Sequence, residues 1–171
     1  SVPISQTTAY AFRDSEHAAN LFALKELGPI YTRLTNPTTD VLEQRFAALE
    51  GGAAAICVAS GQSAIFYAVA NVAEAGDNIL ISDKLYGGAV TLLSHTMKRF
   101  GITTKVFRSE DASNLEEQID GKTKAIFFES LSNPQIAITD VEKVVEIAKR
   151  HGVLTICDNT VATAALFNPI K

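Results

Sequence analysis

Short apolar runs alternate with amphipathic stretches along most of the chain. Five runs rich in Ala, Ile, Val or Phe predict strands, at residues 54–59, 78–82, 102–107, 124–128 and 153–157. The stretches between them predict helices at residues 61–75, 89–100, 114–119 and 140–151, the last with a capping box formed by Thr139 and Glu142. Continuous apolar strands separated by helices are typical of a parallel sheet that is covered on both faces. The expected fold class is therefore α/β, a mostly parallel sheet flanked by helices.

The first 37 residues have a different pattern and predict an extended N-terminal arm. They contain turn residues and scattered aromatic side chains, with one expected helix from about residue 15 to 27. A second helix is expected to begin at Thr38 or Thr39 and to end at Gly51. Its inward face would carry Val41, Leu42, Phe46 and Leu49. The expected organisation is an arm over residues 1–37 followed by one domain over residues 38–171.

Composition and charge argue against several classes of function. The chain has 19 acidic and 15 basic side chains and a formal net charge of −4, so it lacks the basic stripe with which proteins bind nucleic acids or anionic membranes. Cys57 and Cys157 each lie in an apolar run, which favours reduced thiols and a cytoplasmic location. The three histidines lack the paired spacing of metal ligands, so no metal site is expected.

Candidate chemistry lies directly after the apolar runs, because ligands of open α/β sheets bind beyond the carboxyl ends of the strands. Ser60, Gly61 and Gln62 follow the first run and open the next expected helix. The free N–H groups of such a helix start could hold a phosphate. An ordinary helix cap with a turn glycine would give the same three residues, and both interpretations stay open.

Other polar residues follow the later runs. Tyr86 precedes two glycines and could stack on a flat ligand, or be a surface tyrosine before a turn. Asp158 could pair with a protonated ring nitrogen, or be a turn aspartate, and Asn133 could donate to a ligand oxygen, or form a turn before Pro134. Glu129 is interpreted as a loop acid. A phosphate cup, a stacking ring, an amide donor and a carboxylate for a ring nitrogen are together what pyridoxal phosphate needs.

The chain resembles the Cys/Met-metabolism family of pyridoxal-phosphate enzymes of fold type I. The family pattern Tyr-x-Arg-x-x-Asn-Pro-Thr stands at residues 31–38, and its Leu-Glu and Leu-Glu-Gly-Gly elements follow at residues 42–43 and 49–52. The resemblance covers almost the whole chain and implies the large cofactor domain of that fold, incomplete here, with an N-terminal arm.

The resemblance also implies roles for individual residues. Tyr31 and Arg33 would reach a neighbouring subunit and hold its cofactor phosphate, and Gly61 and Gln62 would hold the phosphate from within the subunit. Tyr86 would stack on the ring and Asp158 would pair with its nitrogen, and these two are the expected catalytic residues. The expected cofactor-binding residues are Tyr31, Arg33, Ser60, Gly61, Gln62, Tyr86, Asn133, Asp158 and Thr160, with Asn133 on the ring hydroxyl and Thr160 beside Asp158.

The arm segment at residues 15–26 looks like that of O-acetylhomoserine sulfhydrylases. This implies replacement of acetate by sulfide at Cγ of a small amino-acid substrate, giving homocysteine, in a homo-oligomer with shared active sites. Alternatives within the family are a cystathionine γ-synthase or a methionine or cystathionine γ-lyase. Outside it, an inactive α/β interaction module stays open, whereas a dinucleotide-binding module would need the Gly-x-Gly-x-x-Gly turn that residues 60–63 lack.

The family's Schiff-base lysine lies in a Ser-x-Thr-Lys-like segment beyond the Asp-Asn-Thr at residues 158–160. No such segment occurs up to Lys171. We therefore expect that the chain is a portion of a longer enzyme and is inactive alone.

Overall fold

The computed structural model describes residues 1–170 and contains two compact units. The first comprises Ser1–Cys57 and the second begins at Val58. The boundary expected near residue 37 coincides with the start of a helix of the first unit.

The first unit contains helices α1 (Ser15–Phe22) and α2 (Pro37–Glu50). The side chain of Asn36 caps α2 by accepting from the N–H of Thr38, and Gly51 ends it in the left-handed conformation with φ 74°. Helix α1 is shorter than expected, because Leu24 has a φ of 57° that a helix cannot continue.

The expectation that α2 buries its apolar residues is wrong within this unit. Leu42, Phe46 and Leu49 are 46%, 49% and 59% exposed, and none of the α2 residues is buried. The spacing correctly marks one apolar stripe, but a stripe is buried only where another element packs against it. Residues 1–57 provide only the short helix α1 besides α2.

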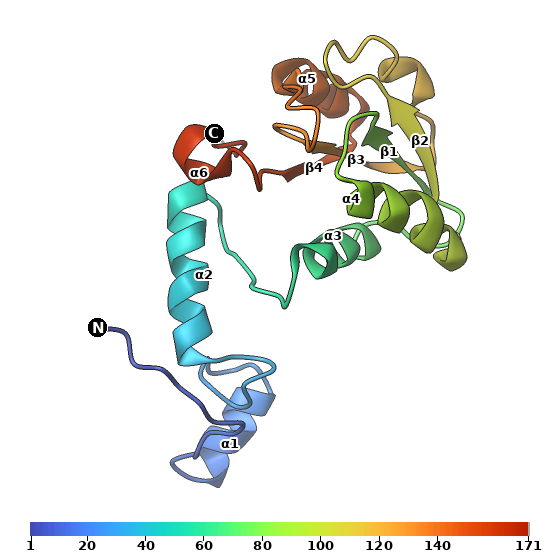
Figure 1. Ribbon diagram of the computed structural model, residues 1–171. Coiled ribbons are helices and arrows are strands. Elements are labelled where there is room, and N and C mark those ends of the chain that lie inside the picture. Colours follow the sequence, from blue (N-terminus) through green and yellow to red (C-terminus); the bar gives the residue numbers. More distant parts are fainter. Residues whose placement is uncertain (171) are drawn as a thin grey trace. The chain divides into compact units, whose positions relative to one another are not determined.

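The second unit contains a four-stranded parallel sheet in the order β2-β1-β3-β4 (Figure 1). The strands are β1 (Asn78–Ser82), β2 (Thr103–Phe107), β3 (Thr123–Glu129) and β4 (Leu154–Asp158). The α/β fold class and these four strands are confirmed. The fifth expected strand, residues 54–59, is wrong for the described residues, since the segment is irregular and pairs with no strand there. An apolar run becomes a strand only where a neighbouring strand supplies ladder hydrogen bonds.

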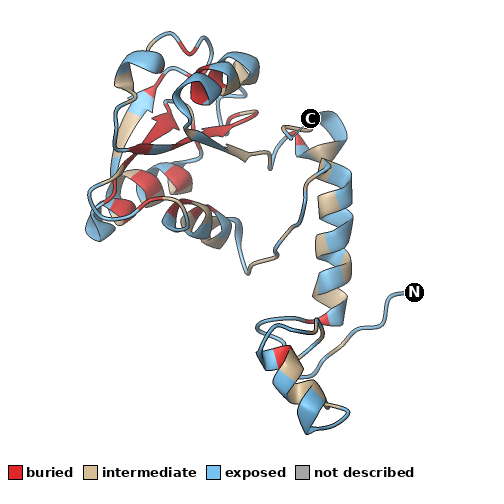
Figure 2. Ribbon diagram, turned by 180° about the vertical axis from the view of Figure 1, so that it is seen from behind, coloured by how far each residue is buried: buried red, intermediate tan, exposed pale blue. Residues whose placement is uncertain are grey.

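Helices cover both faces of the sheet. On one face, α3 (Gly61–Ala70) and the helical stretch α4 (Gly87–Thr91), η1 (Leu92–Thr96) and η2 (Met97–Phe100) pack on Ile79, Ile81 and Phe127. On the other face, α5 (Val141–His151) and the segment with η3 (Glu116–Gln118) pack on Leu80, Ile126 and Phe128. The buried residues accordingly concentrate in the sheet and on the helix sides that face it (Figure 2). A short helix, α6 (Thr163–Leu166), follows β4.

The start of α5 differs from the expected capping box. Asp140 is the cap, and its side chain accepts from the N–H of Lys143. The hydroxyl of Thr139 instead donates to the carbonyl of Glu129 at 2.6 Å, in a buried position. The cap therefore moves one residue along, because the buried carbonyl at the end of β3 takes the threonine hydroxyl.

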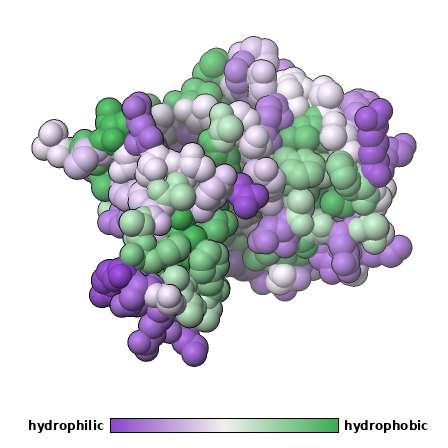
Figure 3. Space-filling model, turned by 90° about the horizontal axis from the view of Figure 1, so that it is seen from below, coloured by the Kyte–Doolittle hydropathy of each residue, from purple (hydrophilic) through white to green (hydrophobic). Residues whose placement is uncertain are grey.

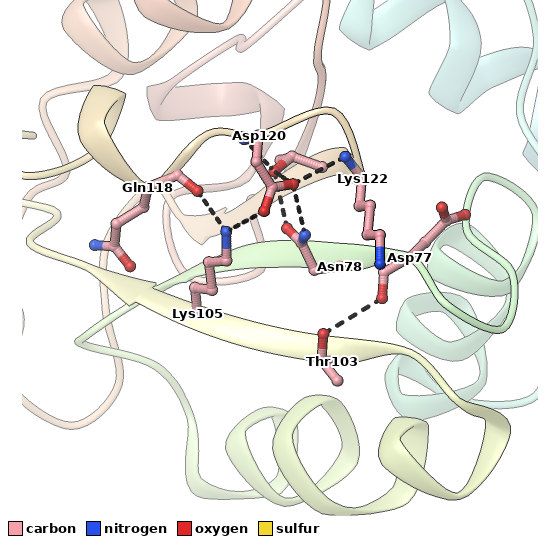
Figure 4. Close-up of polar contacts among 8 residues, drawn as sticks. Asp77, Asn78, Thr103, Lys105, Gln118, Asp120 and Lys122 are labelled. Atoms are coloured by element: carbon pink, nitrogen blue, oxygen red, sulfur yellow. Dashed lines mark hydrogen bonds and ion pairs between the residues drawn. The ribbon is translucent and has the colours of Figure 1, made fainter.

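Polar contacts around Asp120 join β1, β2 and β3 on the side of the sheet away from the carboxyl ends of the strands (Figure 4). Asp120 accepts from the side chains of Asn78 in β1, Lys105 in β2 and Thr123 in β3, at 2.9, 2.7 and 3.2 Å. The bond from Lys105 most of all, then those from Asn78 and from the N–H of Lys122 at 2.8 Å, hold the pKa of Asp120 well below its usual range. Asp120 thus ties strands together at the edge opposite to their carboxyl ends.

The surface includes apolar areas among the hydrophilic ones, seen as green beside purple in Figure 3. Within residues 1–170, no helix combines the length and the apolar character needed to cross a membrane.

Candidate functional site

A cleft of about 330 Å³ lies at the carboxyl ends of β3 and β4, beside the start of α3 and the loop before α4. Of the nine expected site residues, the structure brings seven together there: Ser60, Gly61, Gln62, Tyr86, Asn133, Asp158 and Thr160. Sequence reasoning missed four others that line the cleft: Ile65, Glu129, Leu131 and Val161. The structure thus places these seven residues around one cleft.

The first turn of α3 presents main-chain donors to the cleft. Ser60 is an ordinary cap in one respect, because its Oγ accepts from the N–H of Ser63 at 3.1 Å and its carbonyl accepts from Ala64. The N–H groups of Gly61 and Gln62 lie in the first turn of α3, where the helix itself offers them no acceptor. A Cβ at Gly61 would meet no atom within 4 Å, so an anion can approach this turn closely.

Tyr86 lies directly before α4 and is half exposed at the cleft. Its ring and the side-chain amide of Gln62 converge on Gly88. A Cβ built on Gly88 would lie 2.5 Å from Cε1 of Tyr86 and 2.4 Å from Nε2 of Gln62. Gly88 therefore leaves the space in which the ring and the amide sit.

Asp158 is the last residue of β4 and lines the cleft with Thr160. Its Oδ1 accepts from the N–H of Thr160 at 3.0 Å and also from the Thr160 hydroxyl. These bonds are those of a turn aspartate, and they also fix the direction of the carboxylate. The turn interpretation and the ligand interpretation of Asp158 are therefore compatible.

The expectation that Glu129 is a loop acid is wrong. It is the last residue of β3, only 4% exposed, and pairs in register with Asp158. Its Oε1 accepts from the N–H of Tyr86 at 2.7 Å and its Oε2 from the N–H of Asn133 at 3.0 Å. Burial raises the pKa of Glu129, the two N–H donors oppose this, and the nearby Asp158 carboxylate adds to the rise. The signal was available, since Glu129 ends an apolar run just as Asp158 does.

Asn133 is exposed in the loop that follows β3 and begins a cis peptide bond to Pro134. The loop is held at both ends. The N–H of Ser132 donates to the carbonyl of Ala137, and that of Ser130 to the carbonyl of Asp158. Asn133 therefore reaches the cleft from a fixed loop, with its side chain open to a ligand.

Tyr31 and Arg33 belong to the first compact unit, which is described by itself. The Cζ atom of Arg33 lies 5.6 Å from the centroid of the Tyr31 ring, a cation–π geometry. Both residues are exposed, so the pair can receive a ligand or another surface.

The cleft fits a flat, phosphorylated ring of the kind expected from the sequence. The donors of Gly61 and Gln62 suit an anion, the half-exposed Tyr86 ring suits an aromatic face, and the Asp158 carboxylate suits a protonated ring nitrogen. These three features have different chemistries and line one cleft, as pyridoxal phosphate requires.

Several known proteins are similar to this chain in sequence or in structure. O-acetyl-L-homoserine sulfhydrylase of Leptospira meyeri is 48% identical over 170 residues, which are 99% of this chain and 38% of that protein. A Campylobacter jejuni crystal structure, described as an O-acetylhomoserine (thiol)-lyase with N'-pyridoxyl-lysine-5'-monophosphate, has a TM-score of 0.96 and 59% identity. It matches 99% of this chain and 42% of its own. Cystathionine γ-lyase of Lactobacillus plantarum, complexed with L-serine, has a TM-score of 0.89 at 32% identity, over 99% of this chain and 42% of that one.

The chain thus spans about two-fifths of the length of these proteins. The family model described as Cys/Met metabolism PLP-dependent enzyme matches residues 1–171. The chain therefore belongs to the Cys/Met-metabolism family of enzymes, whose cofactor is pyridoxal phosphate.

Proposed function

We propose that the full-length protein is an O-acetylhomoserine sulfhydrylase. It would exchange the acetate of O-acetylhomoserine for sulfide, breaking the Cγ–O bond, forming a Cγ–S bond and releasing acetate and homocysteine. The observation that carries the proposal is the cleft where α3, Tyr86 and Asp158 meet, in a chain whose similar proteins are described as acting on O-acetylhomoserine.

Each residue of the cleft has a task in this proposal. Bound pyridoxal phosphate supplies an electron sink for removing protons next to the amino group. The N–H groups of Gly61 and Gln62 hold the phosphate, and the ring of Tyr86 packs on the cofactor ring. The carboxylate of Asp158, oriented by Thr160, keeps the ring nitrogen protonated, because an adjacent negative charge favours the charged form. The side-chain amide of Asn133 donates to the ring hydroxyl.

We also infer how the protein is organised. Tyr31 and Arg33 would complete the phosphate site of a neighbouring subunit in a cytoplasmic homo-oligomer, a dimer or a tetramer. A guanidinium fork is well suited to a phosphate, and both residues are exposed in the first unit. The 171 residues alone would be inactive, because none of them matches the family's Schiff-base lysine segment.

The test is a product assay of the purified full-length protein with pyridoxal phosphate and O-acetylhomoserine. We expect homocysteine and acetate with sulfide. Cystathionine formed preferentially from cysteine would identify a cystathionine γ-synthase instead. Release of thiol from methionine or cystathionine without added sulfide would identify a γ-lyase, which the likeness to the Lactobacillus plantarum enzyme keeps as the second candidate.

An absorption spectrum separates these enzymes from an inactive module. The full-length protein should keep a cofactor band after excess pyridoxal phosphate is removed, and borohydride should abolish that band. The 171-residue chain should show no such band. A full-length protein that retains no cofactor would contradict the proposal.

A further inference from the structure

Glu129 is a buried carboxylate to which the proposed function gives no task. It connects two cleft segments that are 43 and 4 residues away in the sequence, because one oxygen accepts from the N–H of Tyr86 and the other from that of Asn133. Both segments carry side chains assigned to the cofactor ring. Glu129 therefore binds the main-chain N–H groups of the two residues that carry the stacking ring and the amide donor.

The main chain of Glu129 is itself held by neighbouring residues. Its main chain is in the ladder opposite Asp158, and its carbonyl accepts from the buried hydroxyl of Thr139. Glu129, at the end of β3, is thus linked to all three residues that carry the stacking ring, the amide and the carboxylate for the ring nitrogen. Their relative positions then depend on a few short hydrogen bonds.

We propose that Glu129 is a positioning residue, which holds the Tyr86 ring and the Asn133 amide in place relative to Asp158 so that the cofactor ring is bound in one orientation. This proposal rests on the proposed cofactor site. It concerns the bridge between the two main-chain N–H groups and assigns Glu129 no contact with the cofactor.

Two substitutions separate the bridge from the charge. Glu129→Gln keeps the shape, but its amide has one acceptor oxygen, and its NH₂ group would face one of the two N–H groups, donor against donor. Glu129→Asp keeps the negative charge but is one methylene shorter, so it cannot reach both segments. Asp83→Asn is the control for loss of a hydrogen-bonded carboxylate elsewhere. Asp83 follows β1 and is exposed, its Oδ1 accepts from the N–H and hydroxyl of Ser109 at 3.0 Å each, and it does not line the cleft.

The experiment uses the full-length protein and two measurements. Amide hydrogen exchange without cofactor should be faster at Tyr86 or Asn133 in both Glu129 variants, and unchanged there in Asp83→Asn. In a titration with pyridoxal phosphate, both Glu129 variants should bind about tenfold more weakly, the scale of a lost hydrogen bond to a charged group. The visible circular dichroism of the bound cofactor should also weaken, because that signal depends on a fixed orientation.

Three results would overturn the proposal. Unchanged exchange in Glu129→Gln would show that there is no bridge. Faster amide exchange in the Glu129 variants, together with wild-type cofactor affinity and dichroism, would show that the bridge holds the two segments but does not orient the cofactor. Wild-type behaviour of Glu129→Asp beside a defective Glu129→Gln would show that charge, and not position, is what the site needs. If the wild type binds cofactor but forms no homocysteine, the proposed reaction fails while the role of Glu129 stands, whereas absence of cofactor binding removes both.

Discussion

At the scale of single residues, two neighbouring glycines in the first turn of α4 have opposite surroundings. A Cβ on Gly87 would meet nothing within 4 Å, whereas one on Gly88 would overlap the ring of Tyr86 and the side-chain amide of Gln62. Both overlapped groups are the ends of side chains that can rotate away. A larger residue at Gly88 should therefore change the positions of these two side chains in the cleft more than it lowers the free energy of unfolding.

Gly88→Ala should weaken pyridoxal phosphate binding by about tenfold or more, because the displaced ring no longer packs on the cofactor. Its midpoint of thermal unfolding without cofactor should stay close to that of the wild type. Gly87→Ala should bind normally and gain about 0.5–1 kcal/mol in free energy of unfolding, the usual gain from alanine in a helix. Titration and thermal denaturation of both variants check this, and equal affinity of the two would contradict the role given to Gly88.

The residues of the cleft were more predictable from the sequence than their contacts. Asp158 and Asn133 could be found because parallel strands deliver the residues at their carboxyl ends to one edge. Ser60 to Gln62 follow a run that is no strand in residues 1–170, and they could be found because they open a helix. The role of Glu129 is not predictable in this way, because a charged residue before a Ser-rich loop has the pattern of a solvated side chain. Its bonds to Tyr86 and Asn133 form only when the segments that carry them are folded together.

At the scale of elements, an apolar run predicts a strand correctly where a neighbouring strand pairs with it, and wrongly where no such strand exists. The strands β1 to β4 lie where the runs at 78–82, 102–107, 124–128 and 153–157 indicated, within a residue at each end. The run at 54–59 has a similar composition and no partner strand in residues 1–170. Pairing is a property of the whole sheet, so composition alone cannot separate these cases.

The contribution of Asp120 to holding the strands together can be tested by measuring how stability depends on pH. Its pKa is lowered in the folded protein, so the folded state binds the proton less tightly than the unfolded chain does. The resulting stabilisation is fully present above the ordinary value of 3.8 and is lost as the pH falls below it. Asp120→Asn should therefore unfold at lower denaturant concentration than the wild type at pH 7, and the difference should shrink steadily as the pH falls below 3.8.

Denaturant unfolding of the full-length protein across this range is the measurement. Lys105→Gln removes the charge behind the largest cause of the lowered pKa and serves as the companion variant, which should lose part of the same pH dependence. A difference between wild type and Asp120→Asn that stays constant from pH 7 to below 3.8 would show that the carboxylate is no more favoured in the folded state than in the unfolded chain.

At the scale of the whole molecule, the first unit leaves apolar and cationic groups exposed. Helix α2 has an exposed apolar stripe, and Tyr31 and Arg33 form an exposed pair before it. A stripe of this kind is stabilised by burial against a further surface. The inferred oligomer would give both features a task, since the stripe would pack on another part of the assembly while the pair binds a phosphate.

The shared site predicts the outcome of mixing two defective subunits. Arg33→Ala alone should weaken cofactor binding about tenfold or more by removing a charged hydrogen-bond donor, and Asp158→Ala alone should abolish activity. A pair of differently tagged subunits, one with each substitution, should recover about half of the wild-type activity, because the Arg33→Ala subunit keeps its own Asp158 and receives Arg33 from its partner. A pair of wild type and Asp158→Ala gives the reference value for one intact site. If Arg33 acts within its own subunit, the doubly defective pair contains no complete site. Its one site with an intact Asp158 would then bind cofactor as weakly as the Arg33→Ala parent does, which would refute the shared arm.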